Sequence, residues 1–272
     1  MKLFNNYFSV KHWFLSALFL GLVTTQAVSQ NLTGYEIMKR SEEKSSPTTS
    51  SYTATMTLVN KKGNTRVREV VFYTKEFSDS KRSVVVFRTP KDVKGVGYLM
   101  WEYKADANGK KKDNDSWLYL PAMKRVRRIL GSESGDDFMG TDFTYDDLGD
   151  RGLIKDNFTL LGEETVNNVP CYKIEATSID KTEKNPRRIL WVRKDNFVVQ
   201  ACEFYNKQNV LQRVLTCENI YELEGIWTTG KMTMKNVVTG SSTVLQMDNV
   251  QYNQEIQDSI FTVASLERGA IK

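Results

Sequence analysis

Histidine is nearly absent from this chain. Its only histidine, His12, lies in an apolar N-terminal stretch, and residues 30–272 contain none. Serine and cysteine nucleophiles commonly rely on a histidine base, and neutral imidazole is the commonest metal ligand in proteins. Residues 30–272 therefore lack the means for Ser–His or Cys–His catalysis and for histidine-bound metals. This absence favours a binding protein over an enzyme, with no catalytic residue, metal or cofactor expected.

Cysteine and long apolar runs are also scarce. The three cysteines, Cys171, Cys202 and Cys217, match no metal motif. A predicted hairpin turn at residues 206–209 sets position 202 opposite position 213, so Cys202 and Cys217 are expected four residues out of register. That offset is about 13 Å at 3.3 Å per residue, too far for a disulfide. After residue 29, no segment approaches the roughly 20 apolar residues of a membrane span.

The N-terminus has the pattern of a secretory signal peptide. Two lysines precede an apolar run at residues 13–23, and Ala27 and Ser29 occupy the −3 and −1 positions before Gln30. A membrane anchor is the alternative, but the run is about half the length that a spanning helix needs. No cysteine follows it that could carry a lipid anchor. We expect a signal peptide at residues 1–29, cleavage at Ser29–Gln30 and a periplasmic location.

The charge of the chain is close to balanced once the signal peptide is removed. The full sequence has 38 Lys and Arg against 33 Asp and Glu, and loss of Lys2 and Lys11 would leave a net charge of +3. Such a balance gives little attraction for nucleic acid, and export makes that partner still less suitable. Residues 30–272 are long enough for one large β domain, and no Pro- or Gly-rich linker divides them.

Alternation of apolar and polar residues dominates the chain and predicts β-strands. One N-terminal helix is predicted at residues 32–44, because Thr33 and Glu36 have the spacing of a capping box. Short turns between many strands predict an antiparallel meander, closed or partly closed into a barrel. The expected strands are residues 51–58, 65–76, 83–88, 97–103, 116–120, 124–129, 157–163, 171–178, 188–193, 198–205, 210–221, 230–238, 243–251 and 260–263.

Some predicted strands are apolar on both faces. Trp117 and Tyr119 point to one side of their strand, and Leu118 and Leu120 point to the other. A sheet with water on one face does not have this pattern. Either helices and loops cover the second face, or that face lines a cavity; composition alone leaves both open.

Residues 131–150 interrupt the alternation and predict a loop with short helical turns. Their Gly-Ser-Glu-Ser-Gly start has glutamate where a nucleophile elbow needs serine. Their aspartates lack the glycine of a calcium loop, so they are expected to cap turns or pair with nearby cations. Those cations occupy a basic strand that would hold a phosphate or lipid headgroup, pair with the loop, or protect a sheet edge: Lys124, Arg125, Arg127 and Arg128.

Two sequence blocks, residues 115–129 and 138–148, together with residues 34–38 and 258–263, resemble the bacterial outer-membrane lipoprotein-sorting protein family. That family is related in fold to the periplasmic lipoprotein carrier LolA. The resemblance spans essentially all of residues 30–272. It implies a mainly β (α+β) domain, a curved, incomplete antiparallel β-barrel covered by a few helices, as in LolA and LolB, whose cavity receives acyl chains.

The resemblance leaves two functions open. One is a periplasmic carrier that shields lipid or lipoprotein acyl chains and takes part in lipoprotein sorting. The other is an accessory protein of an inner-membrane exporter of hydrophobic cargo. We predict that residues 131–150 form a movable cover, hinged at glycines, over a cavity whose mouth is lined by flexible and aromatic side chains: Tyr98, Met100, Trp117, Tyr119, Met139 and Phe143.

Cleavage of the signal peptide is directly testable. Protein recovered from the periplasm should begin at or near Gln30, because Ala27 and Ser29 provide the small residues that signal peptidase requires. Intact mass spectrometry gives the start to the residue. Full-length protein retained in the membrane fraction would show that the N-terminus is an anchor instead.

Overall fold

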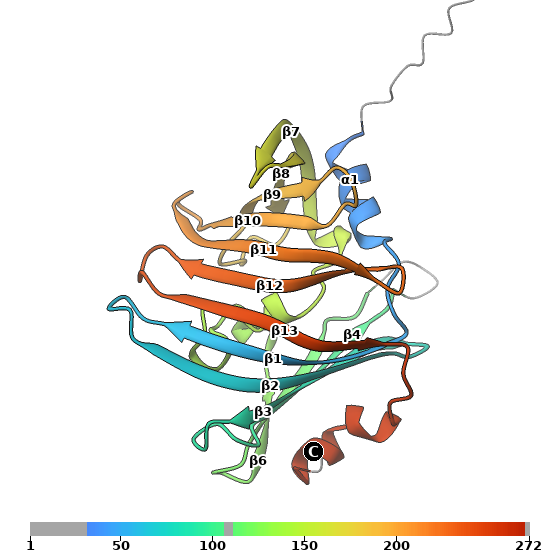
Figure 1. Ribbon diagram of the computed structural model, residues 1–272, viewed down its shortest axis with the longest axis vertical. Coiled ribbons are helices and arrows are strands. Elements are labelled where there is room, and N and C mark those ends of the chain that lie inside the picture. Colours follow the sequence, from blue (N-terminus) through green and yellow to red (C-terminus); the bar gives the residue numbers. More distant parts are fainter. Residues whose placement is uncertain (1–31, 106–110, 270–272) are drawn as a thin grey trace, which may run out of the picture. The chain divides into compact units, whose positions relative to one another are not determined.

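The computed structural model describes residues 32–105 and 111–269, within the compact unit Leu32–Lys272. The predicted signal peptide and its cleavage site lie outside these residues. The described chain forms one antiparallel sheet of 13 strands in the order β6-β5-β4-β3-β2-β1-β13-β12-β11-β10-β9-β8-β7 (Figure 1). The sheet does not close, because β6 and β7 are its two edges. The prediction of an incomplete antiparallel barrel is confirmed.

The strands follow the predicted order, with ends that differ by a few residues. Each neighbouring pair is antiparallel, and the pairing of β1 with β13 joins the two halves of the meander. The strands are β1 (Thr49–Val59), β2 (Thr65–Glu76), β3 (Ser80–Thr89), β4 (Gly97–Tyr103), β5 (Asp115–Leu120), β6 (Arg125–Ile129), β7 (Asp156–Val166), β8 (Val169–Ser178), β9 (Arg187–Arg193), β10 (Val199–Tyr205), β11 (Leu211–Leu223), β12 (Ile226–Asn236) and β13 (Ser242–Tyr252).

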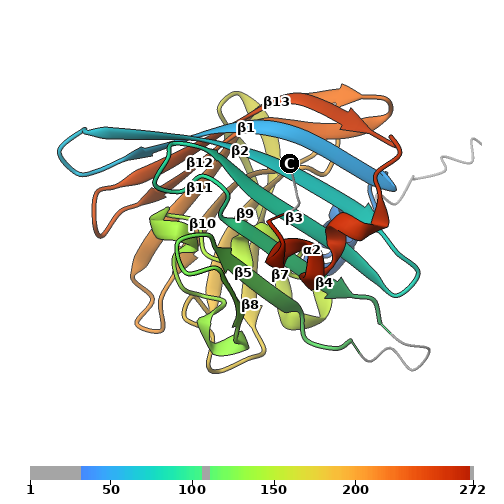
Figure 2. The ribbon, with the colours of Figure 1, turned by 90° about the horizontal axis from the view of Figure 1, so that it is seen from below.

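The sheet curves (Figure 2). Its two faces carry separate cores. The larger core fills the concave face and includes Tyr98, Leu118 and Met234. The chain between β6 and β7 packs over this face in short 3-10 helices, as the sequence predicts: Gly131–Glu133, Phe138–Gly140, Asp146–Leu148 and Leu153–Lys155. The strand with Trp117 and Leu118 is therefore covered on both sides, because the C-terminal segment packs on the outer face of β3 to β6.

The N-terminal helix α1 (Gly34–Glu42) packs against the edge strand β7. Thr33 accepts a hydrogen bond from the Glu36 backbone N–H, and the Glu36 carboxylate accepts one from the Thr33 backbone N–H, so the predicted capping box is present. Gly34 permits the close approach: a Cβ there would lie 2.8 Å from the Leu160 backbone nitrogen. No helix in the described residues is long and apolar enough to cross a bilayer.

The C-terminal segment is helical, so the strand predicted at residues 260–263 is wrong. A 3-10 helix (Asp258–Phe261) leads into α2 (Val263–Glu267), and the Thr262 hydroxyl caps α2 by accepting a hydrogen bond from the Ser265 N–H. The two adjacent apolar residues there suit a short amphipathic turn as well as a strand. Phe261 and Leu266 are buried on the outer face of the sheet with Val84, Val86 and Leu99.

The predicted β10–β11 register is also wrong by two residues. Cys202 faces Leu215, because the turn closes between Asn206 and Val210, one residue later than predicted, and an irregularity between Phe204 and Tyr205 adds a second residue to the shift. Cys202 and Cys217 are therefore two residues out of register instead of four, and all three cysteines are buried and free.

Phe261 should be a principal anchor of the C-terminal segment. Its side chain is fully buried and meets Phe77 edge-on with 5.8 Å between ring centroids. Phe261→Ala should lower the free energy of unfolding by about 3–5 kcal/mol, since it empties a packed aromatic site. Urea denaturation measures this, with the exposed Ser259→Ala as control. A loss below about 1 kcal/mol would mean that α2 does not close the outer core.

Candidate functional site

A cavity of about 330 Å³ opens on the concave face between the sheet and the covering chain. Its floor consists of side chains that antiparallel pairing brings to one face: Cys202 is paired with both Leu190 and Leu215. Tyr98 and Met100 reach it from β4. The other apolar residues of its wall are Ile129, Leu130, Val199 and Phe204.

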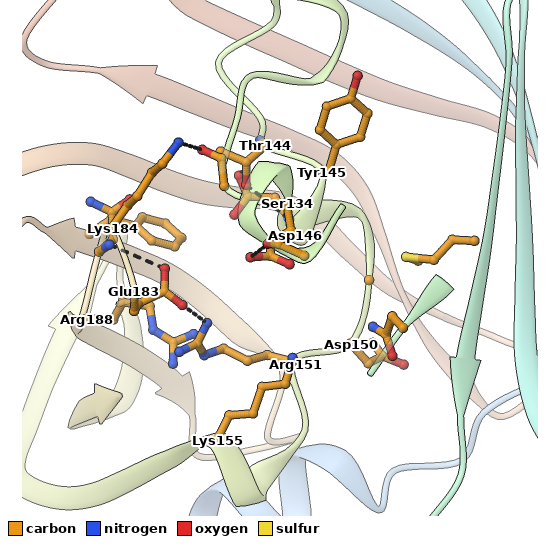
Figure 3. Close-up of a pocket in the computed structure, with 18 of the residues that line it drawn as sticks. Ser134, Thr144, Tyr145, Asp146, Asp150, Arg151, Lys155, Glu183, Lys184 and Arg188 are labelled. Atoms are coloured by element: carbon orange, nitrogen blue, oxygen red, sulfur yellow. Dashed lines mark hydrogen bonds and ion pairs between the residues drawn. The ribbon is translucent and has the colours of Figure 1, made fainter. Parts of the chain in front are cut away.

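Charged side chains surround the mouth of this cavity (Figure 3). Lys184 forms an ion pair with Asp136, and the Ser134 hydroxyl donates to Asp146 over 2.9 Å. Burial raises the pKa of Asp146, partly offset by the hydrogen bond from Ser134. Arg213 reaches Asp147 on the covering chain. These contacts join the cover to β11 and to the β8–β9 loop.

A second cavity of about 480 Å³ lies beside the first, between the sheet and α1. The two cavities share one wall, formed by the short segment 149–151, which we call the strap, and by Arg188, Leu190 and Val199. Lys44 lines the second cavity and donates to the Phe197 carbonyl oxygen; its burial lowers its pKa. The strap and Arg188 are thus the boundary between two spaces with a common apolar floor.

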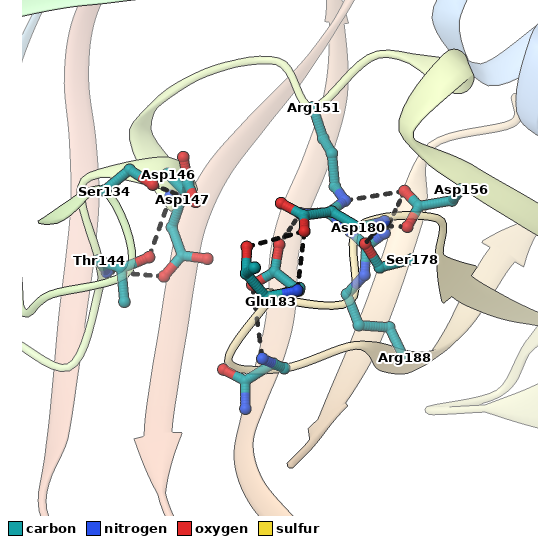
Figure 4. Close-up of polar contacts among 12 residues, drawn as sticks. Ser134, Thr144, Asp146, Asp147, Arg151, Asp156, Ser178, Asp180, Glu183 and Arg188 are labelled. Atoms are coloured by element: carbon teal, nitrogen blue, oxygen red, sulfur yellow. Dashed lines mark hydrogen bonds and ion pairs between the residues drawn. The ribbon is translucent and has the colours of Figure 1, made fainter. Parts of the chain in front are cut away.

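The strap is fixed by an ion-pair network (Figure 4). Arg151 donates to Asp156 and to Glu183, each over 2.8 Å, and Arg188 also pairs with Asp156. Burial disfavours the ionised form of Asp156, but the hydrogen bond from Arg151 and the charges of both arginines outweigh it and lower the pKa. The same contacts raise the pKa of Arg151 despite its burial. Both groups therefore stay charged.

A buried carboxyl group holds the other side of the strap. Glu102 on β4 is 5 % exposed and accepts a hydrogen bond from the Asp150 backbone N–H over 2.6 Å. Burial, and then the nearby Asp150 carboxylate, raise the pKa of Glu102 to about 7, although Lys81 opposes the shift. Gly149 is needed here, because a Cβ would lie 2.9 Å from Glu102 Oε1. Lys81 also pairs with Asp150 over 2.7 Å.

The structure brings only part of the predicted cavity lining together. Tyr98 and Met100 line the first cavity, but Trp117 and Tyr119 lie on the outer face of the sheet. The pairing of Leu99 with Trp117 gives the reason, since directly paired residues share a face and Leu99 points away from Tyr98. The prediction that all four residues line one cavity mouth is wrong, because Trp117 and Tyr119 face the opposite side of the sheet from Tyr98 and Met100. Trp117 meets Trp101 edge-on in the outer core.

The remaining two predicted lining residues belong to the covering chain. Phe143 is buried in the inner core, and Met139 packs against that core. Neither side chain lines the described cavities. Met139 adopts a left-handed backbone conformation (φ 51°), and its carbonyl oxygen accepts a hydrogen bond from Arg68 over 2.8 Å. These residues fasten the cover to the sheet.

Among the described residues, the basic strand contacts the acidic loop through Arg127. This residue pairs with Glu133 over 2.6 Å and also hydrogen-bonds Tyr145, whereas Arg128 reaches back to Asp115. The loop aspartates instead pair with Lys184 and Arg213 on the other half of the sheet, which corrects the expected neighbourhood. β6 is an edge strand of the sheet. Of the roles considered for its basic residues, protection of a sheet edge by charge fits this position. Lys124 and Arg125 are exposed and form no ion pair with a described residue.

Sequence reasoning missed the polar residues around the strap. Arg151 and Asp156 have no motif spacing, and Arg188 lies more than 30 residues further along the chain. Glu102 stands in an aromatic strand where a carboxylate is unusual, and this is the signal that the sequence offers. The described residues contain no cluster of three or more His, Cys, Asp or Glu side chains that could hold a metal ion.

Comparisons with known proteins agree with this architecture. A family model described as "-like: Uncharacterized protein" matches residues 79–268. A DUF1329 family protein from Desulfovibrio piger is 31 % identical, covers 86 % of this chain and 97 % of its own, and superimposes with a TM-score of 0.80. No curated protein matches the chain significantly.

Two further solved structures are similar. An outer membrane lipoprotein-sorting protein domain from Vibrio parahaemolyticus is 28 % identical over 86 % of this chain and 98 % of its own, with a TM-score of 0.79. A LolA superfamily protein from Nitrosomonas europaea is 19 % identical over 86 % of this chain and 99 % of its own, with a TM-score of 0.65, a similarity of fold.

Ionisation of Glu102 should weaken the fold as pH rises. A carboxyl whose folded pKa is raised from 4.5 to about 7 contributes stability below pH 4.5 that is lost as pH rises to 7. Glu102→Gln keeps an acceptor for the Asp150 N–H but cannot ionise. Relative to the wild type, it should raise the free energy of unfolding at pH 8 by up to about 3 kcal/mol and change it little at pH 4.5.

Urea denaturation at pH 4.5, 6 and 8 measures this difference. Glu69→Gln, at an exposed position of β2, is the matched control and should show no such pH dependence. If Glu102→Gln is no more stable than the wild type at pH 8, then Glu102 is not held in an environment that disfavours its charge.

Proposed function

Because this chain belongs to the family of DUF1329 and outer-membrane lipoprotein-sorting proteins, with the fold of the LolA superfamily, we propose that it is a carrier of lipid or lipoprotein acyl chains. It acts in the periplasm as a single domain, residues 30–272, after removal of the signal peptide at residues 1–29. The observation that carries the proposal is the pair of adjoining cavities on the concave face, which share an apolar floor.

The size and lining of the cavities suit an acyl chain. Small-molecule sites in proteins are typically about 300–1,000 Å³ and mostly apolar, with a few polar groups at fixed places. Burial of ten methylene groups would supply roughly 8 kcal/mol, at about 0.8 kcal/mol each. This corresponds to a dissociation constant of about 1 μM before the costs of ordering are subtracted. Tyr98 and Met100 are the predicted lining residues that serve this role.

The strap decides how much of this space one chain can use. While Arg151 and Arg188 hold Asp156, the strap separates the two cavities, and a chain in either would occupy only that one. Movement of residues 149–151 would join the spaces over Leu190 and Val199. The charged groups at the cavity mouth are of both signs. They keep the mouth hydrated, and they give the site no strong preference for an anionic or a cationic headgroup.

The alternative is an accessory protein of an inner-membrane exporter of hydrophobic cargo, with a filled or vestigial cavity. Cavities of about 330 and 480 Å³ support the carrier instead. Native purification followed by mass spectrometry of extracted lipid distinguishes the two, because a carrier should retain acyl-chain lipid in stoichiometric amount.

Filling the shared wall should block cargo binding. Val199 faces both cavities, so Val199→Phe should weaken binding of a fluorescent fatty acid at least ten-fold while the protein remains folded. Fluorescence titration measures the affinity, and circular dichroism checks the fold.

The matched control is Val214→Phe. Val214 is also half-buried, but it is paired with Glu203 and Lys235 and lines neither cavity. Its substitution should leave probe affinity unchanged. Equal affinity in both variants, or no probe binding by the wild type, would contradict the carrier proposal.

A further inference from the structure

Three neighbouring hairpin turns form one end of the sheet, which we call the hairpin rim: residues 60–64, 206–210 and 236–241. Strand pairing sets them side by side, since Val59 pairs with Ser242 and Val214 pairs with Lys235. The Val237 N–H donates to the Gln212 carbonyl over 2.9 Å. In Figure 1 the tips lie on the left, on the side opposite α1.

The rim exposes apolar side chains at its tips. Val238 is 65 % exposed, the largest fraction among the large apolar residues of the described chain, and Val210 is 53 % exposed. Val237, beside Val238, is 39 % exposed. One exposed valine on a surface is ordinary, but three on adjoining turns form a small apolar group with no covering element.

Lysines accompany these valines without acidic partners. The three turns contain Lys61, Lys62 and Lys207 and no Asp or Glu. All three lysines are exposed, and none forms an ion pair with a described residue. Lys207 does act on Asp180 of the adjacent β8–β9 turn. The pKa of Asp180 is lowered mainly by hydrogen bonds from Thr182 and, to a lesser extent, by the charge of Lys207. The Asp142 carboxylate of the cover also reaches the rim, where it accepts a hydrogen bond from the Ser241 hydroxyl. With three lysines against this carboxylate, the rim has an excess of positive charge.

At the opposite end of the sheet, the β9–β10 turn has its cations neutralised. Lys194, on the β9–β10 turn, pairs with Glu163 over 2.7 Å. Arg193 pairs with Asp195 on the same turn, also over 2.7 Å. Lysines without an ion-pair partner therefore distinguish the turns of the rim from the β9–β10 turn.

The rim turns also provide hydrogen-bond acceptors for their own backbone N–H groups. Each begins with an asparagine whose side-chain oxygen accepts two backbone N–H groups of its own turn. These residues are Asn60, Asn206 and Asn236. Backbone N–H groups without partners are costly where water is scarce, so this capping lowers the cost of placing the tips in an apolar boundary.

We propose that the hairpin rim docks on the surface of an anionic phospholipid bilayer. The three valines enter the interface between headgroups and acyl chains, and Lys61, Lys62 and Lys207 approach the phosphate groups. The tips are convex and self-capped, which suits a fluid surface, whereas a folded protein partner would need a matching hollow lined with carboxylates. This inference goes beyond the carrier role and does not depend on the cavities.

Vesicle sedimentation tests the proposal. The purified protein should bind vesicles of phosphatidylglycerol and phosphatidylcholine in equal parts, bind vesicles of phosphatidylcholine alone much less, and dissociate in high salt. The double variant Lys61→Gln, Lys62→Gln should bind the anionic vesicles about 25-fold more weakly, since each lysine near an anionic surface strengthens binding about five-fold. Val237→Ser with Val238→Ser should also weaken binding.

The matched control is Lys39→Gln with Arg40→Gln, which removes two positive charges from exposed positions of α1 and should leave vesicle binding unchanged. Equal binding to both vesicle types, or equal binding by the rim and α1 variants, overturns the proposal. So does self-association that the rim variants abolish without any vesicle binding, which would make the rim an interface between copies. Fatty-acid affinity should be the same in all variants, so failure of the carrier proposal is detected separately.

Discussion

Directly paired residues on neighbouring antiparallel strands point to the same face, so the register of this sheet decides which side chains can meet. The pairing runs without a break from β6 to β7, through the contact of β1 with β13. Every strand therefore contributes alternate residues to one continuous concave face. Because that face is largely apolar and the sheet is open, something else must cover it. The chain between β6 and β7, together with α1, does so, and the cavities are the part of the face that this cover leaves unfilled.

The cover is attached both by apolar packing and by polar contacts: Phe138 and Phe143 are buried in the inner core, and ion pairs join the cover to the rest of the chain. Arg213 holds Asp147, and Arg151 holds both Asp156 and Glu183. Breaking one partner of a buried ion pair is costly because the other charge is left without compensation. The pairs around Asp156 are of this buried kind, whereas the pair between Lys184 and Asp136 is exposed and contributes little. The ion pairs thus hold the cover firmly near the strap and more weakly near residues 131–136.

The order and type of nearly all elements follow from the sequence, because alternation and turn residues are local signals. The Thr33 capping box and the β2 and β4 boundaries are examples. The site was less predictable because it depends on non-local register. Trp117 and Tyr98 are both aromatic and both on strands, and only the pairing of β4 with β5 reveals that they face opposite ways. The network of Arg151, Asp156 and Arg188 is assembled by tertiary contact, which no spacing in one sequence encodes.

Packing in the outer core restricts the movement of β4, which also lines the cavity on the other face. A strand that must pack on both sides has little freedom to tilt, and β4 packs against α2 through Leu99 while presenting Tyr98 and Met100 inward. The Trp101 Nε1–H also donates to the Phe261 carbonyl, which ties the same strand to the C-terminal segment. Under the carrier proposal, cargo entry would therefore depend on movement of the cover and not on spreading of this part of the sheet. The carboxyl of Glu102, on β4, contacts the strap through the Asp150 N–H, so its protonation state bears on how strongly the strap is held to the sheet.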